Sequence, residues 1–118
     1  MDPTQPQYEI IRHRSFQDDL VAIIDYLTEN ASYKIALQLE EEIQSQLDLI
    51  SILPKMYPVY ESQPRLRKMP IHNWQYVIFY TIIEKNHQII LTRIFHTSRN
   101  IQALMQKRRC GRRRGTGL

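Results

Sequence analysis

The stretch that decides the fold lies at residues 75–95, which read QYVIFYTII (75–83), EKNH (84–87) and QIILTRIF (88–95). The first segment carries β-branched and aromatic side chains on both of its faces, which is typical of a central strand in a sheet. The polar segment EKNH forms a turn, and the third segment returns as the partner of the first. Residues 75–95 therefore predict an antiparallel hairpin.

Two amphipathic helices are predicted upstream of this hairpin. Residues 7–13 form a short first strand, and Ser15 then opens the first helix, with Asp18 in a capping-box arrangement. Ser32 caps the second helix and Pro54 ends it. The predicted core stripes are Phe16, Leu20, Ile23, Ile24 and Leu27 in the first helix and Ala36, Leu39, Ile43, Leu47 and Ile50 in the second. The acidic residues face solvent, namely Asp18, Asp19 and Asp25 in the first helix and Glu40, Glu41 and Glu42 in the second.

The order of the elements predicts the fold class. Residues 54–64 hold three prolines and form a loop that leads into the extended segment 65–69, which Pro70 ends. A final short helix starts at Ser98 or Asn100 and runs through Met105. The resulting order, β-α-α-β-β-β plus a short C-terminal helix, predicts an α+β fold. We expect a small antiparallel sheet with the N-terminal helical hairpin packed on one face and the other face at least partly open.

Charged residues on the strands are the first candidates for a functional surface. Arg65 and Arg67 are two positions apart and therefore point to the same side of their strand. Arg93 interrupts the last strand, and His96 follows it. Because burying an unpaired guanidinium costs several kcal/mol, we expect the three arginines to border a solvent-accessible surface. The alternative for Arg65 and Arg67 is a charged edge strand with no other role. The alternative for His96 is a structural role, because histidines at strand ends are more often hydrogen-bond partners than catalysts.

Composition and charge narrow the class of protein. The chain has 118 residues and a formal net charge of +4, which fits one domain, residues 1–106, and a basic, disordered tail, residues 107–118. Residues 1–48 hold 3 basic and 10 acidic side chains, whereas residues 49–106 hold 7 and 2 and the tail holds 6 and none. A split of this kind favours a polyanionic or acidic partner for the second half.

Several classes of protein are disfavoured. No apolar run approaches the roughly 18 residues that span a bilayer, so no membrane partner is expected. The first residues lack the pattern of a secretory signal. Cys110 is the only cysteine, and the histidines have no metal-ligand spacing. The expectation is a cytoplasmic protein without metal or cofactor.

In its order of elements and in the end of its last hairpin, the chain resembles the ParE/RelE toxins of type II toxin–antitoxin systems. The resemblance covers residues 8 to about 106. It rests on the first strand and helix, on the basic strand 65–69, and on the aromatic strand YVIFY (76–80) followed by ILTRIFHTSRN (90–100). It implies a toxin neutralised by a cognate antitoxin in a hetero-oligomer.

The resemblance leaves two targets open, because ParE-like toxins inhibit DNA gyrase whereas RelE-like toxins cut messenger RNA on the ribosome. RelE-like members often carry an arginine where Val77 stands, and valine cannot stabilise a phosphorane. This favours a ParE-like gyrase inhibitor that is not an enzyme. The alternatives are a ribosome-dependent endoribonuclease that uses Arg65, Arg67, Arg93 and His96, and a non-toxic module that binds nucleic acid. Surface contacts to target or antitoxin are expected at Arg65, Arg67, Lys68, Arg93, His96 and Arg99.

Overall fold

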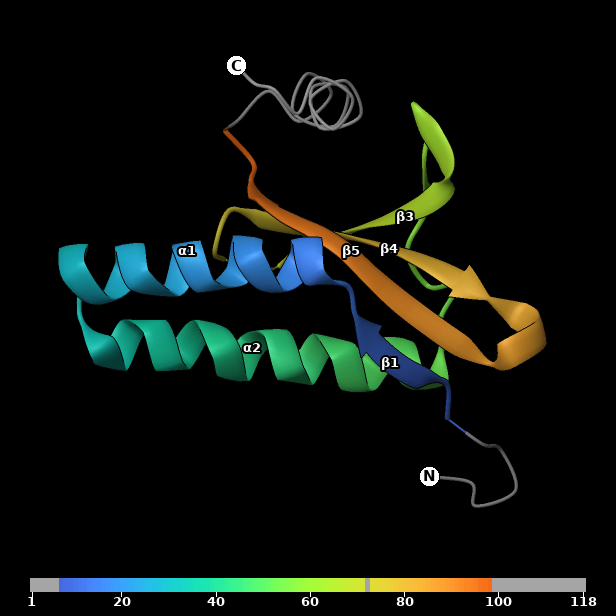
Figure 1. Cartoon of the computed structure of the whole chain (residues 1–118), viewed down its shortest axis with the longest axis horizontal. Helices are drawn as coiled ribbons and strands as arrows, with labels where there is room; N and C mark the ends of the chain where they lie inside the picture. The colour runs from blue at the N-terminus through green and yellow to red at the C-terminus, as the bar shows by residue number, and fades with distance from the viewer. Residues whose placement is uncertain (1–6, 72, 99–118) are drawn as a thin grey trace.

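The computed structural model describes residues 7–71 and 73–98. In chain order its elements are β1 (Glu9–Arg12), α1 (Arg14–Asn30), α2 (Tyr33–Ile52), β2 (Val59–Tyr60), β3 (Gln63–Ile71), β4 (Tyr76–Ile83), the 3-10 turn η1 (Glu84–Asn86) and β5 (Gln88–His96). The two helices lie side by side in one layer against the sheet (Figure 1). The predicted C-terminal helix, the basic tail and Arg99 lie outside the described residues.

The sheet is mixed, which corrects the purely antiparallel sheet expected from the sequence. Its strand order is β1-β5-β4-β3-β2. β5 pairs antiparallel with β4, as the hairpin predicted, but β1 pairs parallel with β5 in the register Glu9 to Gln88 and Arg12 to Leu91. The two strands are far apart in the chain, so no local signal reveals that they are neighbours. The two-residue strand β2, which lies in the predicted loop, extends the sheet at the opposite edge.

Both helices begin at a side-chain cap, but only one of the two caps is the predicted one. The hydroxyl of Ser32 accepts a hydrogen bond from the N–H of Ile35 at 3.1 Å and caps α2. The cap of α1 lies two residues earlier than expected, because Nδ1 of His13 accepts from the N–H of Ser15 at 3.1 Å. Ser15 is therefore a buried residue of the first turn and not the cap.

The main core lies between the helices and one face of the sheet. All five residues of the predicted α2 stripe are buried, as are Phe16 and Leu20 of α1. Tyr80 of β4 is fully buried, and its hydroxyl donates a 2.8 Å hydrogen bond to the carbonyl of Pro54. Burial raises the pKa of Tyr80 from 10.0 to about 12.

A second, smaller cluster lies on the opposite face of the sheet. It consists of Val77, Phe79 and Phe95, with Tyr60 and Leu66 packed against them. β4 thus contributes buried side chains to both faces, which confirms the prediction of a central strand.

Candidate functional site

The end of β5 is held by an ion pair with α1. The guanidinium of Arg93 contacts the carboxylate of Asp19 through two hydrogen bonds, Nε to Oδ2 at 2.6 Å and Nη2 to Oδ1 at 2.9 Å. Oδ2 also accepts from the N–H of Ile94 at 3.1 Å. Only 15% and 16% of the two side chains are exposed. The expectation that Asp19 faces water was wrong. Arg93 borders the solvent, but its guanidinium is held in the ion pair with Asp19.

The carboxylate of Asp19 continues the edge pairing that β1 begins. β1 covers the outer edge of β5 as far as Leu91, whose carbonyl accepts from the N–H of His13 at 2.9 Å. The chain then turns into α1, so the next part of the β5 edge has no strand beside it. Because an unpaired edge N–H that is partly buried costs free energy, the contact from Asp19 to Ile94 stabilises this part of the sheet.

A bulge in β5 determines which way these side chains point. Phe79 pairs with Arg93 and Tyr80 pairs with Leu91, so Thr92 is the extra residue. Its hydroxyl donates to the carbonyl of Phe79 at 3.0 Å. Leu91 and Ile94 consequently both reach the main core, whereas Phe95 belongs to the second cluster. Arg93 lies 4.4 Å from the ring of Phe95, which supports the guanidinium from one side.

A groove of about 750 Å³ runs between α1 and the ends of β4 and β5. Its walls are mostly apolar and aromatic, and its polar groups come from the Asp19–Arg93 pair, His96 and Ser98. We call it the α1–β5 groove, and its lining residues are Asp19, Ala22, Ile23, Tyr26, Leu27, Trp74, Tyr76, Arg93, Ile94, Phe95, His96 and Ser98. A concave, mainly apolar surface with a few convergent polar groups is the usual form of a binding site.

His96 is oriented within this groove. Its ring meets Tyr76 edge-on at a centroid distance of 5.2 Å, and its Nδ1 accepts from the N–H of Ser98 at 3.1 Å. In the neutral imidazole the proton is then on Nε2, which leaves that atom as a donor. Burial raises the pKa of Tyr76, so this phenol stays protonated beside the histidine.

The basic residues of β3 do not form one surface. Arg67 pairs with Tyr80 and therefore lies on the helix side, where its Nη1 donates to the carbonyl of Tyr57 at 2.7 Å. Arg65 is exposed, and strand alternation places it on the same side, as predicted. Lys68 pairs with Phe79 on the opposite face, and its Nζ lies 5.9 Å from the ring of Tyr60.

The structure thus brings some predicted residues together and separates others. Arg93 and His96 line one groove, whereas Arg65, Arg67 and Lys68 lie on β3, on the far side of β4. Val77 is 1% exposed and packs in the second cluster, so an apolar side chain occupies the position at which RelE-like members often carry an arginine.

Two functional candidates were missed by the sequence reasoning. Asp19 was assigned to the solvent-facing side, but it lies four residues before Ile23 and eight before Leu27, so its helical spacing was a signal that could have found it. Arg12 is exposed at the end of β1 and lines a hollow between the two helices. No pattern in the sequence marked it, because the hollow is formed by residues of three elements.

Some kinds of site are not found in the described part of the chain. Residues 7–71 and 73–98 contain no group of three or more histidine, cysteine or acidic side chains that could hold a metal ion. No helix among these residues is long and apolar enough to cross a membrane.

The fold is that of toxins from toxin–antitoxin systems. One solved structure, described as the chromosomal ParDE system from P. aeruginosa, superposes with a TM-score of 0.65 and 18% sequence identity, covering 76% of this chain and 96% of that one. The isolated E. coli RelE toxin superposes with a TM-score of 0.51 and 13% identity, covering 86% and 97%. At these identities the likeness shows the fold. No curated protein sequence matches the chain.

The family is shown by the sequence itself. The family described as the ParE toxin of the type II toxin–antitoxin system, parDE, matches residues 10–101. The chain therefore belongs to the ParE toxin family and is the toxin component of a type II system, as its resemblance implied.

Proposed function

We propose that this chain is an inhibitor of DNA gyrase that is not itself an enzyme, and that a cognate antitoxin holds it inactive. The observation that carries the proposal is the state of two positions in the sheet, Val77 and Arg93, at which a ribonuclease of this fold would be expected to place a free cation. Val77 is a buried apolar residue, and the guanidinium of Arg93 is already bound by Asp19. A phosphorane needs a cation that is free to approach it, and neither position supplies one.

The α1–β5 groove and the exposed cations of β3 are the proposed contact surfaces. Arg65 and Lys68 are both exposed, so acidic side chains of a partner reach them at a small desolvation cost. Arg93 and His96 contribute donors within the groove, and Arg67 lies beside Arg65 on β3. Arg99, which follows the last described residue, belongs to the same proposal.

The experiment that tests the target is induction of the chain without an antitoxin, followed by pulse labelling of nascent DNA, RNA and protein. An early fall in DNA synthesis with an SOS response and intact transcripts supports gyrase inhibition. Purified chain should then block supercoiling by gyrase in vitro. An immediate fall in protein synthesis with cleaved messages would show a RelE-like ribonuclease and would overturn the proposal.

The antitoxin is identified in the same cells. Open reading frames that adjoin the gene are co-expressed with the chain, and the one whose product restores growth and co-purifies with it is the antitoxin. A chain whose expression leaves growth and macromolecular synthesis unchanged would be inactive, which also contradicts the proposal.

A further inference from the structure

Three hydrogen-bond donors converge at the end of β5, and a carboxylate of the same chain lies between them. Nε and Nη2 of Arg93 and the backbone N–H of Ile94 all donate to Asp19, at 2.6, 2.9 and 3.1 Å. A guanidinium and a backbone N–H at such distances are the usual partners of carboxylate and phosphate groups. We call the three donors the β5 oxyanion site, and the carboxylate of Asp19 is the anion that occupies it.

Two of the features that hold these donors do not involve Asp19. The N–H of Ile94 is fixed in the sheet, because Ile94 is a core residue of β5 and only 1% exposed. The ring of Phe95 lies 4.4 Å from the guanidinium of Arg93 and supports it from one side. An anion from solution can therefore take the place of a missing Asp19 carboxylate and hold Arg93 in its present position.

The β5 oxyanion site opens into the α1–β5 groove. Asp19 and Arg93 both line this groove, whose volume is about 750 Å³, and their side chains are 16% and 15% exposed. The groove is large enough for a phosphate group. Because water screens a partly buried guanidinium less than an exposed one, an anion bound there is held more strongly. The Asp19 carboxylate prevents this binding, since it repels phosphate and already holds the guanidinium.

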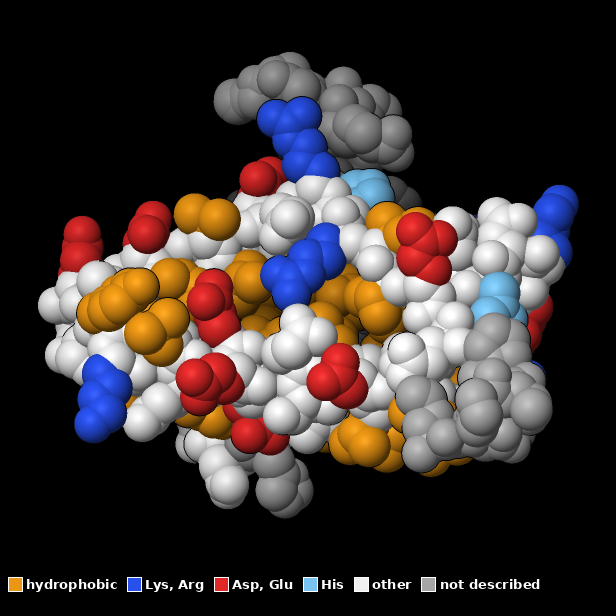
Figure 2. Space-filling view, turned by 90° about the horizontal axis from the view of Figure 1, so that it is seen from below, with side chains coloured by type: hydrophobic (Ala, Val, Ile, Leu, Met, Phe, Trp, Pro, Cys, Tyr) orange, Lys and Arg blue, Asp and Glu red, His pale blue; other side chains and the backbone are white. Residues whose placement is uncertain are grey.

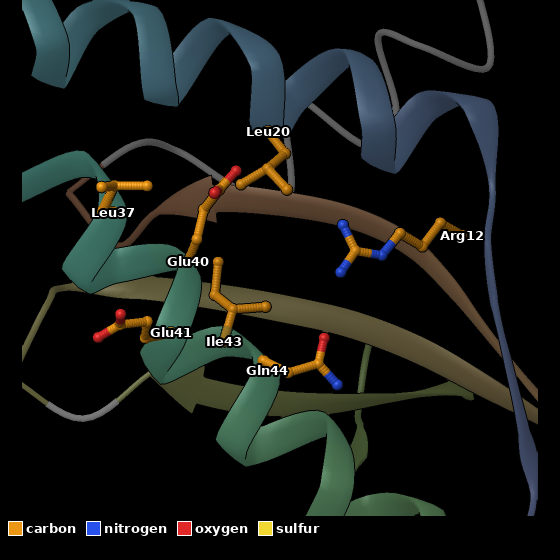
Figure 3. A pocket seen from close by; sticks show the side chains of 7 residues that line it. All are labelled: Arg12, Leu20, Leu37, Glu40, Glu41, Ile43 and Gln44. Atoms are coloured by element: carbon orange, nitrogen blue, oxygen red, sulfur yellow. The ribbon is translucent and has the colours of Figure 1, made fainter. Parts of the chain in front are cut away.

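The pairing of Arg93 does not follow from the acidic helical layer alone. Figure 2 shows acidic side chains around hydrophobic ones on one face of the molecule. Arg12 lines the hollow between the two helices together with Glu40 and Glu41, and the carboxylate of Glu41 points away from it (Figure 3). In the part of the chain that the structure describes, Arg12 forms no ion pair. Nearby acidic residues are thus not enough, and the two-point contact of Arg93 requires a carboxylate at the position of Asp19.

We infer that Asp19 determines which partners the α1–β5 groove accepts, because its carboxylate fills the β5 oxyanion site and keeps phosphate groups out. The inference rests on the proposed function, in which the chain does not cut RNA. Loss of this one carboxylate converts the groove into a phosphate site, with Arg93 and the N–H of Ile94 as donors. With Asp19 present, the groove favours uncharged and apolar partner surfaces over phosphodiesters.

Thermal unfolding with and without inorganic phosphate tests the inference on the full chain. About 10 mM phosphate should raise the melting temperature of Asp19→Ala by roughly 5 °C relative to sodium chloride at the same ionic strength, since a ligand that binds only the folded chain stabilises it. The unchanged chain should shift by less than about 1 °C. Asp18→Ala is the matched control, because it removes one negative charge at the exposed neighbouring position, and it should behave like the unchanged chain. Adding Arg93→Ala to Asp19→Ala should abolish the shift.

Fluorescence anisotropy with a short single-stranded RNA distinguishes a phosphodiester from free phosphate. Asp19→Ala should bind the RNA roughly 5-fold more tightly than the unchanged chain, with a salt dependence that is steeper by about one phosphate contact. Asp18→Ala should change the affinity by less than about 2-fold. Stabilisation by phosphate without tighter binding of RNA would contradict the role of Asp19 in excluding phosphodiesters.

Failure of the inference and failure of the proposed function give different results. Asp19→Asn keeps the volume of the side chain and serves for both measurements if Asp19→Ala does not fold. An equal phosphate shift in the unchanged chain, or no shift in either Asp19 variant, would overturn the inference and leave gyrase inhibition untouched. Cleavage of RNA by the unchanged chain would overturn the proposed function and the inference together.

Discussion

Asp19 connects the helical layer to the sheet through a single carboxylate. It accepts from Arg93 and from the backbone N–H of Ile94, so its two oxygens serve three donors. A half-buried carboxylate with this many charge-assisted hydrogen bonds holds its partners in one geometry. The position of Arg93, and with it one wall of the α1–β5 groove, therefore depends on a residue of the first helix.

Replacing Asp19 with asparagine removes this charge and leaves Arg93 unpaired in a half-buried place. We expect Asp19→Asn to lower the free energy of unfolding by about 2–3 kcal/mol, which is less than for a fully buried pair because water still screens it. Urea denaturation measures the loss. Asp18→Asn, at the exposed neighbouring position, is the control and should change stability by less than about 0.5 kcal/mol. A similar small change for both variants would show that the pair contributes little.

His96 tests the function of the groove without removing the ion pair. His96→Ala should raise the expression level needed for growth arrest roughly 10-fold, because one of the polar donors of the groove is lost. Its melting temperature should stay within about 3 °C of the unchanged chain, since His96 is only partly buried. Arg93→Ala is a poorer probe because it leaves Asp19 unpaired. Undiminished toxicity of His96→Ala at equal expression would place the active surface elsewhere.

Tyr80 gives the fold a dependence on alkaline pH. Its pKa is raised from 10.0 to about 12 mainly by burial, so folding favours the protonated phenol. The stability that this residue contributes is fully present below pH 10 and is lost as the pH rises through 12. Tyr80→Phe should therefore lose less stability between pH 10 and pH 12 than the unchanged chain, as measured by urea denaturation at each pH. Equal losses would show that another group titrates.

At the scale of elements, the two helix caps show how much local sequence decides. Ser32 is followed by a regular apolar stripe, and its side chain has no tertiary partner among the described residues that competes with the cap. His13 caps α1 because β1 ends at Arg12 and the backbone of His13 is still extended, with ψ of 152°. The position of the α1 cap is therefore determined by the residue at which β1 ends. Local residue preferences do not reveal that residue.

Ser32→Ala should lower the free energy of unfolding by about 1 kcal/mol, because one N–H of the first turn of α2 loses its acceptor. Thermal unfolding followed by circular dichroism measures the change. Ser45→Ala is the matched control, since Ser45 is an exposed residue inside the same helix, where alanine is the better helix former. A loss of stability in the control as large as in Ser32→Ala would contradict the assignment of the cap.

At the scale of the whole molecule, the chain is acidic in its first half and basic in its second, and the basic tail carries 6 of the 16 basic side chains. Ending the chain at Gln106 should leave growth arrest intact and reduce the salt-dependent binding of non-specific DNA. Gel shifts at two salt concentrations measure the binding. Loss of toxicity on truncation would assign the tail to the active surface, whereas toxicity that survives it would rule out the alternative of a non-toxic module that binds nucleic acid through its tail.

Several features of the fold could be predicted because their signals are local. The β4–β5 hairpin has alternating and aromatic segments around a polar turn, and the α2 stripe repeats at helical spacing over most of the helix. Other features could not be predicted in this way. The parallel pairing of β1 with β5, the bulge at Thr92 and the contact of Asp19 with Arg93 join residues that are far apart in the chain.

The sequence by itself determined the α+β class, the helical hairpin, the central strand and membership of a toxin family, because periodicity and residue type are enough for each. Only the tertiary structure decided how the charged residues are used. Arg93 is bound by Asp19 and Arg67 by the carbonyl of Tyr57, whereas Arg12 lines a hollow between the two helices. The physical reason is that the free energy of a charge depends on its partner and on its exposure, and both are determined by the packing of distant elements.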